Sequence, residues 1–188
     1  MVRKITIWYV LLPYLLNYKR NLLLADFEKE LKIPHQTISK YLKQLTNEKI
    51  LKTEKKEKHA IYSINFKNPF IYDYLSISEK IKTYNLMAKS PLLKRLHELF
   101  SKFFSESSFL VFGSFAEKLT GNDLDLLIVG KYNKELKETI KSFSLTYGIE
   151  IHSVPTNMDN LTPAFIQEIA KKHIMINNSD LFVTFLIK

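Results

Sequence analysis

Two aspartates, Asp123 and Asp125, directly precede an apolar run, Leu126-Leu127-Ile128-Val129. The run predicts a buried strand, and residues i and i+2 of a strand point to the same face. The two carboxylates would then lie side by side, where they repel each other unless a cation lies between them. Oxygen-only ligands of this kind suit Mg²⁺, which commonly takes one or two carboxylates together with phosphate oxygens and water.

A Gly-Ser pair lies upstream of the two aspartates. Residues 109–112 predict a short buried strand, and Gly113 and Ser114 follow it directly, before a short helical segment over 115–119. Gly113 permits a close approach of the backbone. Ser114, together with the unpaired N–H groups that open the next helix, can hold a phosphate. A metal site beside a phosphate-binding turn is what phosphoryl or nucleotidyl transfer requires.

The block FGSFAEKLTGNDLDLLIVG, residues 112–130, resembles the minimal nucleotidyltransferases of the DNA polymerase β superfamily. Their signature is Gly-Ser, a short spacer, and then Asp-hydrophobic-Asp on a strand. The closing segment IQEIAKKHIMINNSDLFVTFL, residues 166–186, is similar to the terminal helices of the minimal forms. The resemblance covers about residues 90–188 and implies a small mixed β-sheet with flanking helices.

The resemblance implies a role for each matched residue. Gly113 and Ser114 would bind the β and γ phosphates of a nucleoside triphosphate, with ATP the first choice. Asp123 and Asp125 would bind Mg²⁺ and act as catalytic residues. Glu150, on a strand predicted over 149–154, would supply the third catalytic, metal-binding carboxylate. The implied reaction transfers a nucleoside monophosphate to a hydroxyl and releases pyrophosphate. The acceptor stays open among a protein tyrosine or serine, an RNA end and a small molecule.

The chain departs from the family pattern at three points. The spacer between Ser114 and Asp123 has eight residues, which is shorter than usual. Glu117-Lys118 replaces an Arg-Gly pair, so Lys118 is expected as the phosphate contact, although an ammonium lacks the guanidinium fork. Glu150 stands where Asp is commoner. The first two departures favour an alternative, in which the domain senses nucleotide or is inactive and the protein is a DNA-binding transcriptional regulator.

The N-terminal part has the pattern of a winged helix. Helices are expected over 5–18, where Pro13 would kink the helix or start a new segment, over 25–31 and over 35–49. The last two are separated by a short turn, as in a helix-turn-helix, and strands over 50–53 and 60–64 form a hairpin with a charged tip. Residues 31–65, LKIPHQTISKYLKQLTNEKILKTEKKEKHAIYSIN, resemble the winged-helix regulators of the ArsR and MarR type. The resemblance covers about residues 5–66.

This second resemblance implies binding to double-stranded DNA, with the third helix approaching the major groove and the hairpin near phosphates. A homodimer is expected, because such regulators read two half-sites. A dimerisation or protein-docking module is the other interpretation of the domain. The expected DNA contacts are His35, Gln36, Thr37, Ser39, Lys40 and Lys43 on the helix and Lys55, Lys56 and Lys58 on the wing.

Charge and composition agree with this division of the chain. The net charge is +9, and residues 1–105 hold 20 Lys and Arg against 9 Asp and Glu, whereas residues 106–188 hold 8 against 10. A basic part beside a near-neutral one favours a polyanion partner for the first, or simply a Lys-rich solvated surface. Cysteine is absent, which excludes disulfides and thiolate zinc sites. No apolar run approaches the roughly 18 residues of a membrane span, so we expect a cytoplasmic protein without a membrane partner.

The sequence therefore predicts an α+β protein of three segments. These are a winged helix-turn-helix over 1–66, a helical connector over 67–106 and a minimal nucleotidyltransferase domain over 107–188. The predicted function is a Mg²⁺-dependent nucleotidyltransferase carrying a DNA-binding domain. Two alternatives stay open: the regulator described above, and an antitoxin-type partner protein of a small helical toxin.

Overall fold

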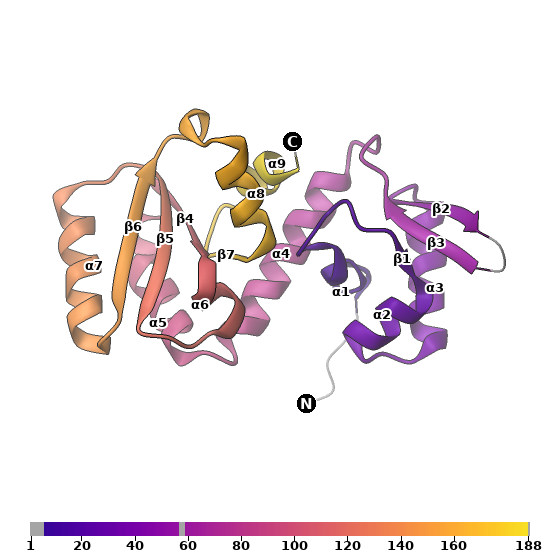
Figure 1. The fold of residues 1–188 in the computed structure, drawn as a ribbon, viewed down its shortest axis with the longest axis horizontal. Coiled ribbons are helices and arrows are strands. Elements are labelled where there is room, and N and C mark those ends of the chain that lie inside the picture. The colour runs from indigo at the N-terminus through magenta and orange to yellow at the C-terminus, as the bar shows by residue number, and fades with distance from the viewer. Residues whose placement is uncertain (1–5, 57–58, 188) are drawn as a thin grey trace. The chain divides into compact units, whose positions relative to one another are not determined.

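A computed structural model describes residues 6–56 and 59–187 of the chain (Figure 1). The chain divides into two compact units, Met1–Ile81 and Lys82–Lys188. Each unit contains helices and its own β-sheet, so the predicted mixed α+β class is confirmed. No helix among the described residues is long and apolar enough to cross a membrane.

The first unit combines short helices with a three-stranded antiparallel sheet in the order β1-β3-β2. The helices α2 and α3 and the hairpin were expected from the sequence, whereas β1 is a strand that the sequence did not indicate. Its elements are α1 (Ile7–Val10), a 3-10 helix (Leu12–Tyr14), β1 (Leu22–Leu23), α2 (Leu24–Leu31), α3 (His35–Asn47), β2 (Leu51–Lys56) and β3 (His59–Ile64).

Local signals set the ends of the helices in this unit. Pro13 lies in the 3-10 helix that follows α1, so the segment over 5–18 is broken and not one helix. The backbone N–H of Leu23 donates to the Asp26 carboxylate at 2.7 Å and caps α2. Lys32 ends α2 with a left-handed backbone, φ 56°, and Pro34 precedes the first turn of α3. The two helices are thereby separated by a tight turn, as the helix-turn-helix pattern predicted.

The inner face of α3 fixes the orientation of its outer face. Ile38, Leu42 and Leu45 recur at helical spacing and are fully buried. Phe27 of α2 is buried too, and its ring lies 5.7 Å from that of Tyr14 in an edge-on contact. Because these apolar positions are all covered, the polar residues of α3 point to solvent.

The expected connector over 67–106 contains two long helices, α4 (Ile71–Met87) and α5 (Pro91–Phe100), and a 3-10 helix, Ser101–Phe103. The boundary between the units, Ile81/Lys82, falls within α4. Ser90 caps α5, because its hydroxyl accepts from the backbone N–H of Leu93 at 3.2 Å.

The second unit is built on a four-stranded mixed sheet in the order β6-β5-β4-β7, where β5 and β6 are parallel and the other pairs are antiparallel. The strands are β4 (Ser107–Phe112), β5 (Asp123–Gly130), β6 (Glu150–Thr156) and β7 (His173–Met175). Its other elements are α6 (Gly113–Lys118), α7 (Lys134–Tyr147), a 3-10 helix (Met158–Asn160), α8 (Pro163–Lys171) and α9 (Ser179–Leu186).

The two faces of this sheet have different roles. Leu124, Leu126 and Ile128 of β5 belong to the main core, which also contains Phe100 of α5 and Phe143 of α7. The intervening residues of β5 point to the opposite face because strand side chains alternate. That face is partly covered by α8, whose Phe165 packs on Phe112 of β4. The start of β5 is left free to carry polar groups.

Candidate functional site

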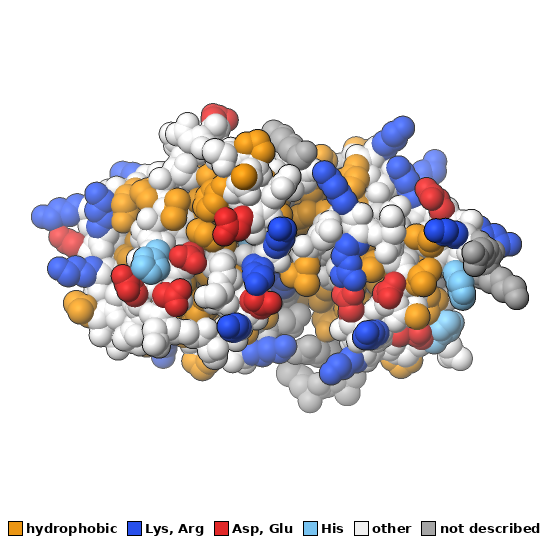
Figure 2. Space-filling view, in the orientation of Figure 1, with side chains coloured by type: hydrophobic (Ala, Val, Ile, Leu, Met, Phe, Trp, Pro, Cys, Tyr) orange, Lys and Arg blue, Asp and Glu red, His pale blue; other side chains and the backbone are white. Residues whose placement is uncertain are grey.

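The pairing of β5 with β6 brings the predicted carboxylates into one row. Asp123 is paired with Glu150, and Asp125 is paired with His152, in the parallel register of these two strands. Neighbouring strands lie about 4.8 Å apart, and paired residues point to the same face. Figure 2 shows acidic side chains gathered around a histidine over β5 and β6. The three residues predicted as catalytic thus share one edge of one face of the sheet.

The Gly-Ser turn lies against this row. Phe112 is paired with Asp125 across β4 and β5, so Gly113 comes directly beside the Asp125 carboxylate. Gly113 has φ +72°, and a Cβ built on it would overlap Oδ2 of Asp125. A side chain at residue 113 would therefore be strained by the left-handed backbone and would push the Asp125 carboxylate aside. The sequence analysis expected a close approach of the backbone at Gly113, and this approach is a physical reason for a glycine at that position.

The row of carboxylates is electrostatically crowded. Asp125 is half-buried, and burial is the main cause that raises its pKa above the ordinary value. The negative charges of Asp123 and Glu168 raise the pKa of Asp125 further, while His152 lowers it. Asp123 is exposed, and the side chain of Glu150 is 76% exposed. His152 Nδ1 lies 4.0 Å from Glu150 Oε1. Carboxylates therefore outnumber the basic groups named at this edge, where His152 is the basic neighbour of Asp125 and Glu150.

Asp123 and Asp125 are side chains of the kind that would suit Mg²⁺ if phosphate oxygens and water completed its shell. Among the described residues, no group of three or more His, Asp and Glu side chains is arranged to hold a metal ion. Mg²⁺ commonly takes only one or two carboxylates and completes its shell with phosphate oxygens and water. Asp123 and Asp125 would supply that pair, with Glu150 exposed on the neighbouring strand. The donor set is therefore suitable for Mg²⁺.

Ser114 and Lys118 lie at opposite ends of α6. Ser114 is exposed in the first turn, beside Gly113, whereas Lys118 is exposed at the last residue. Four residues separate the two positions, which is roughly 6 Å along a helix axis. Glu117 forms an ion pair with Lys172 Nζ at 2.6 Å, and this ion pair lowers the pKa of Glu117. Ser114 thus directly follows the glycine that lies against Asp125, whereas Lys118 lies one helical turn further along α6.

The predicted DNA contacts on α3 lie on its outer surface. Five of them are exposed and Thr37 is half-buried. His35 Nδ1 lies 3.0 Å from Glu28 Oε1 of α2, so this side chain is partly engaged within the unit. The helix His35–Asn47 contains no acidic residue. The five exposed residues are His35, Gln36, Ser39, Lys40 and Lys43.

The wing presents further lysines. Lys55 and Lys56 are exposed on β2, paired with Ala60 and His59 of β3. The predicted contact Lys58 lies outside the described residues. Lys52 is also exposed on β2. The sequence analysis did not name it among the lysines of the hairpin, although it alternates with the buried Leu51.

Sequence reasoning also missed Glu168 of α8, which lies close enough to Asp125 to influence its charge. No spacing rule relates the two residues, because their proximity depends on how α8 packs on the sheet. His152 lies on the same face as Glu150, because side chains alternate along β6.

The chain has a distant structural neighbour. No family model matches the chain, and no curated protein sequence matches it. A comparison of structures matches TrmBL2, described as an archaeal chromatin protein whose structure "shows a novel mode of DNA binding", at 12% sequence identity and a TM-score of 0.29. The match covers 80% of this chain and 63% of the TrmBL2 chain. At that TM-score the likeness carries no argument about fold or function.

The close approach of Gly113 to Asp125 yields a test with a matched control. Gly113→Ala places a Cβ against the carboxylate in a left-handed backbone, whereas Gly148 has φ +63° and open space around a Cβ. Both Ala variants should lose about 1 kcal/mol or more of unfolding free energy from backbone strain. Only Gly113→Ala should also displace Asp125 and weaken Mn²⁺ binding, measured by titration calorimetry. Equal Mn²⁺ affinity in the two variants would contradict this description of the site.

Proposed function

We propose that the unit Lys82–Lys188 is a metal-dependent nucleotidyltransferase that transfers a nucleoside monophosphate from a triphosphate, in the first place ATP, to a hydroxyl. The observation that carries the proposal is the packing of Asp125 against the Gly113 backbone, with Asp123 and Glu150 in the same row. The strand order agrees with it, because a Gly-Ser turn after one strand and two carboxylates on the next are the arrangement of the family that residues 112–130 resemble.

Each residue then has a defined task. Mg²⁺, when bound, would neutralise phosphate charge and polarise the reacting phosphorus. Asp123 and Asp125 would hold the ion, and Ser114 with the turn at Gly113 would hold the outer phosphates. The acceptor oxygen forms a bond to the α-phosphorus as the bond to the bridging oxygen breaks. Pyrophosphate leaves, and the proton of the acceptor hydroxyl passes to Glu150.

Binding of triphosphate tests this proposal directly. ATP and the other triphosphates are titrated by calorimetry into the full chain, with Mg²⁺ or with EDTA. Wild type should bind only with Mg²⁺, and Asp123→Ala/Asp125→Ala should weaken binding by at least about 10-fold, because it removes both cation ligands.

The matched control is Glu135→Ala/Glu138→Ala, which removes two exposed carboxylates of α7. The control should bind as wild type does. If the wild-type protein bound no triphosphate in the presence of Mg²⁺, the proposal of an enzyme would be contradicted. That result would leave the alternative of a DNA-binding regulator with an inactive domain.

A second proposed activity is binding of double-stranded DNA by the unit Met1–Ile81. The acid-free helix α3 with exposed Lys40 and Lys43, next in sequence to a hairpin with exposed Lys55 and Lys56, favours it. Lysines on such a surface bind phosphates, whereas Gln36 and Ser39 can reach base edges. A homodimer would present two such helices to two half-sites. The DNA-binding unit would then bring the transferase, or a nucleotide sensor, to one locus.

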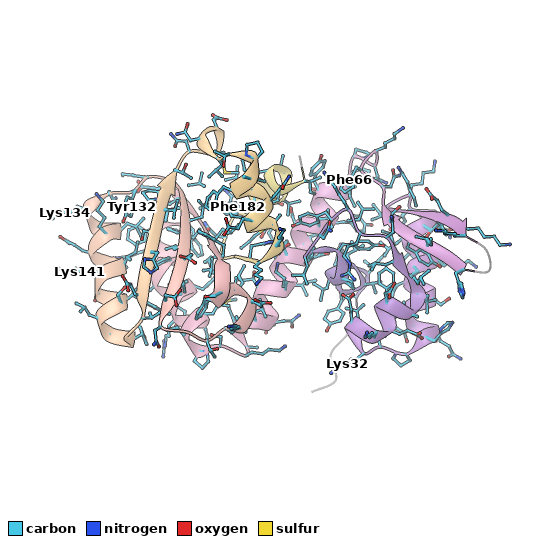
Figure 3. All side chains as sticks on the ribbon, viewed as in Figure 1. Lys32, Phe66, Tyr132, Lys134, Lys141 and Phe182 are labelled. Atoms are coloured by element: carbon cyan, nitrogen blue, oxygen red, sulfur yellow. The ribbon has the colours of Figure 1, made fainter. Side chains whose placement is uncertain are left out.

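Salt dependence distinguishes phosphate binding from a merely solvated lysine surface. Lys40→Ala/Lys43→Ala should reduce the slope of log K against log salt by about 0.9 for each phosphate that the variant no longer neutralises, measured by fluorescence anisotropy on a DNA duplex. The control is Lys134→Ala/Lys141→Ala, two exposed lysines whose side chains point outward from α7 (Figure 3). An unchanged slope in the α3 variant would contradict DNA binding through this helix.

A further inference from the structure

The helix α3 ends in a turn that contains a lysine with a left-handed backbone. The backbone N–H of Ile50 donates to the carbonyl of Leu45 at 2.9 Å, and that of Lys49 donates to the carbonyl of Thr46 at 3.0 Å. These two bonds form a Schellman motif, in which the left-handed residue is usually glycine. Lys49 takes that position with φ 58°, so contacts from outside the helix are needed to hold the turn.

Three side chains from residues 65–74 supply those contacts, and we call Asn65, Asn68 and Tyr74 the α3 clamp. Nδ2 of Asn65 donates to the carbonyl of Lys49 at 2.7 Å. Nδ2 of Asn68 donates to the carbonyls of Glu48 and Lys49, at 3.0 and 3.1 Å. The hydroxyl of Tyr74 donates to Oε2 of Glu48 at 2.8 Å. All three side chains therefore bind the two residues that directly follow α3.

The hydroxyl of Tyr74 is a well-placed donor. The ring of Tyr74 lies 6.4 Å from that of Trp8 in α1. Burial and the hydrogen bond to Glu48 raise the pKa of Tyr74 to about 12, so the hydroxyl keeps its proton at neutral pH. The other carboxylate oxygen of Glu48 accepts from Nε2 of Gln44 at 2.8 Å. Through Glu48, Tyr74 is thus joined to a side chain in the last turn of α3.

The same segment joins the end of α3 to the base of the wing. Asn65 directly follows β3, and its backbone N–H donates at 2.9 Å to the carbonyl of Ile50, which directly precedes β2. The Oγ1 atoms of Thr46 in α3 and Thr53 in β2 lie 3.2 Å apart. The end of the helix and both strands of the hairpin are thereby tied to one another.

We propose that the α3 clamp positions α3 against the wing and thereby determines how well the protein discriminates between DNA sequences. This inference rests on the proposed DNA binding and deepens it. Hydrogen bonds from Gln36 and Ser39 to base edges depend on distance and angle, so they need the helix at a fixed depth. Lys40 and Lys43 have long, flexible side chains that reach phosphates from several helix positions. Loosening the clamp therefore lowers discrimination and leaves the phosphate contacts in place.

The test compares the affinities of the full chain for two DNA duplexes by fluorescence anisotropy. One duplex is the sequence that wild type enriches from a random library, and the other is the random-sequence duplex itself. The variant Tyr74→Phe/Asn68→Ser removes two clamp donors. It keeps the ring of Tyr74, and the serine hydroxyl can still accept from the backbone N–H of Phe70, as Oδ1 of Asn68 does at 2.8 Å.

The ratio of the two affinities should fall at least about 10-fold in this variant, which corresponds to the loss of about one good base contact. The affinity for the random-sequence duplex and its salt slope should stay as in wild type. A fold that is merely less stable lowers both affinities together and leaves their ratio unchanged. The matched control, Tyr72→Phe/Asn21→Ser, changes the same residue types at exposed positions and should keep the wild-type ratio.

The outcomes separate this inference from the proposed DNA binding. Wild type that binds no duplex overturns the proposed DNA binding and the inference with it. Wild type that binds duplexes but enriches no sequence, or a clamp variant that keeps the wild-type ratio, overturns only the role of the clamp. Should thermal unfolding show that the double variant does not fold, Tyr74→Phe is measured alone. A fall in the ratio of about 3-fold is then expected for one lost hydrogen bond, and an unchanged ratio overturns the inference.

Discussion

The close packing of the Asp125 carboxylate on the Gly113 backbone is the constraint on which the site depends. It joins the end of β4 to the start of β5, and it exists because Phe112 and Asp125 are paired in the sheet. With that pairing fixed, the first turn of α6 begins beside a carboxylate. With β6 in parallel register on the other side of β5, Glu150 joins the same row. Two hydrogen-bonded registers, of β4 with β5 and of β5 with β6, therefore assemble groups from three segments of the chain.

The same arrangement opposes folding locally. Burial and neighbouring negative charges raise the pKa of Asp125, so the ionised carboxylate is less favourable in the folded chain than in the unfolded one. The fold tolerates this because the opposite face of the strand is secured by Leu124, Leu126 and Ile128 in the main core. A carboxylate whose pKa is raised by burial and by neighbouring negative charges is typical of functional sites. The proposed cation would offset this cost when bound.

Local patterns in the sequence were sufficient for part of this account. Alternation predicted that Asp123 and Asp125 share a face, and the Gly-Ser pair marked the turn. Pro13 was expected to kink the helix over 5–18 or to start a new segment, and it does lie in a separate 3-10 helix after α1. β1 has only two residues and no periodicity. The position of Glu168 near Asp125 could not be predicted from the sequence. It depends on the packing of Phe165 on Phe112 and on the ion pair of Lys172 with Glu117.

We propose that a cation and a triphosphate bind together between the Asp123–Asp125 pair and the Gly113 turn. The most direct measurement is a crystal structure of the full chain with Mn²⁺ and a non-hydrolysable ATP analogue, with anomalous diffraction recorded at the manganese edge. We expect an anomalous peak in contact with both aspartates and phosphate density beside Gly113 and Ser114. A peak elsewhere, or an analogue bound away from β5, would contradict it.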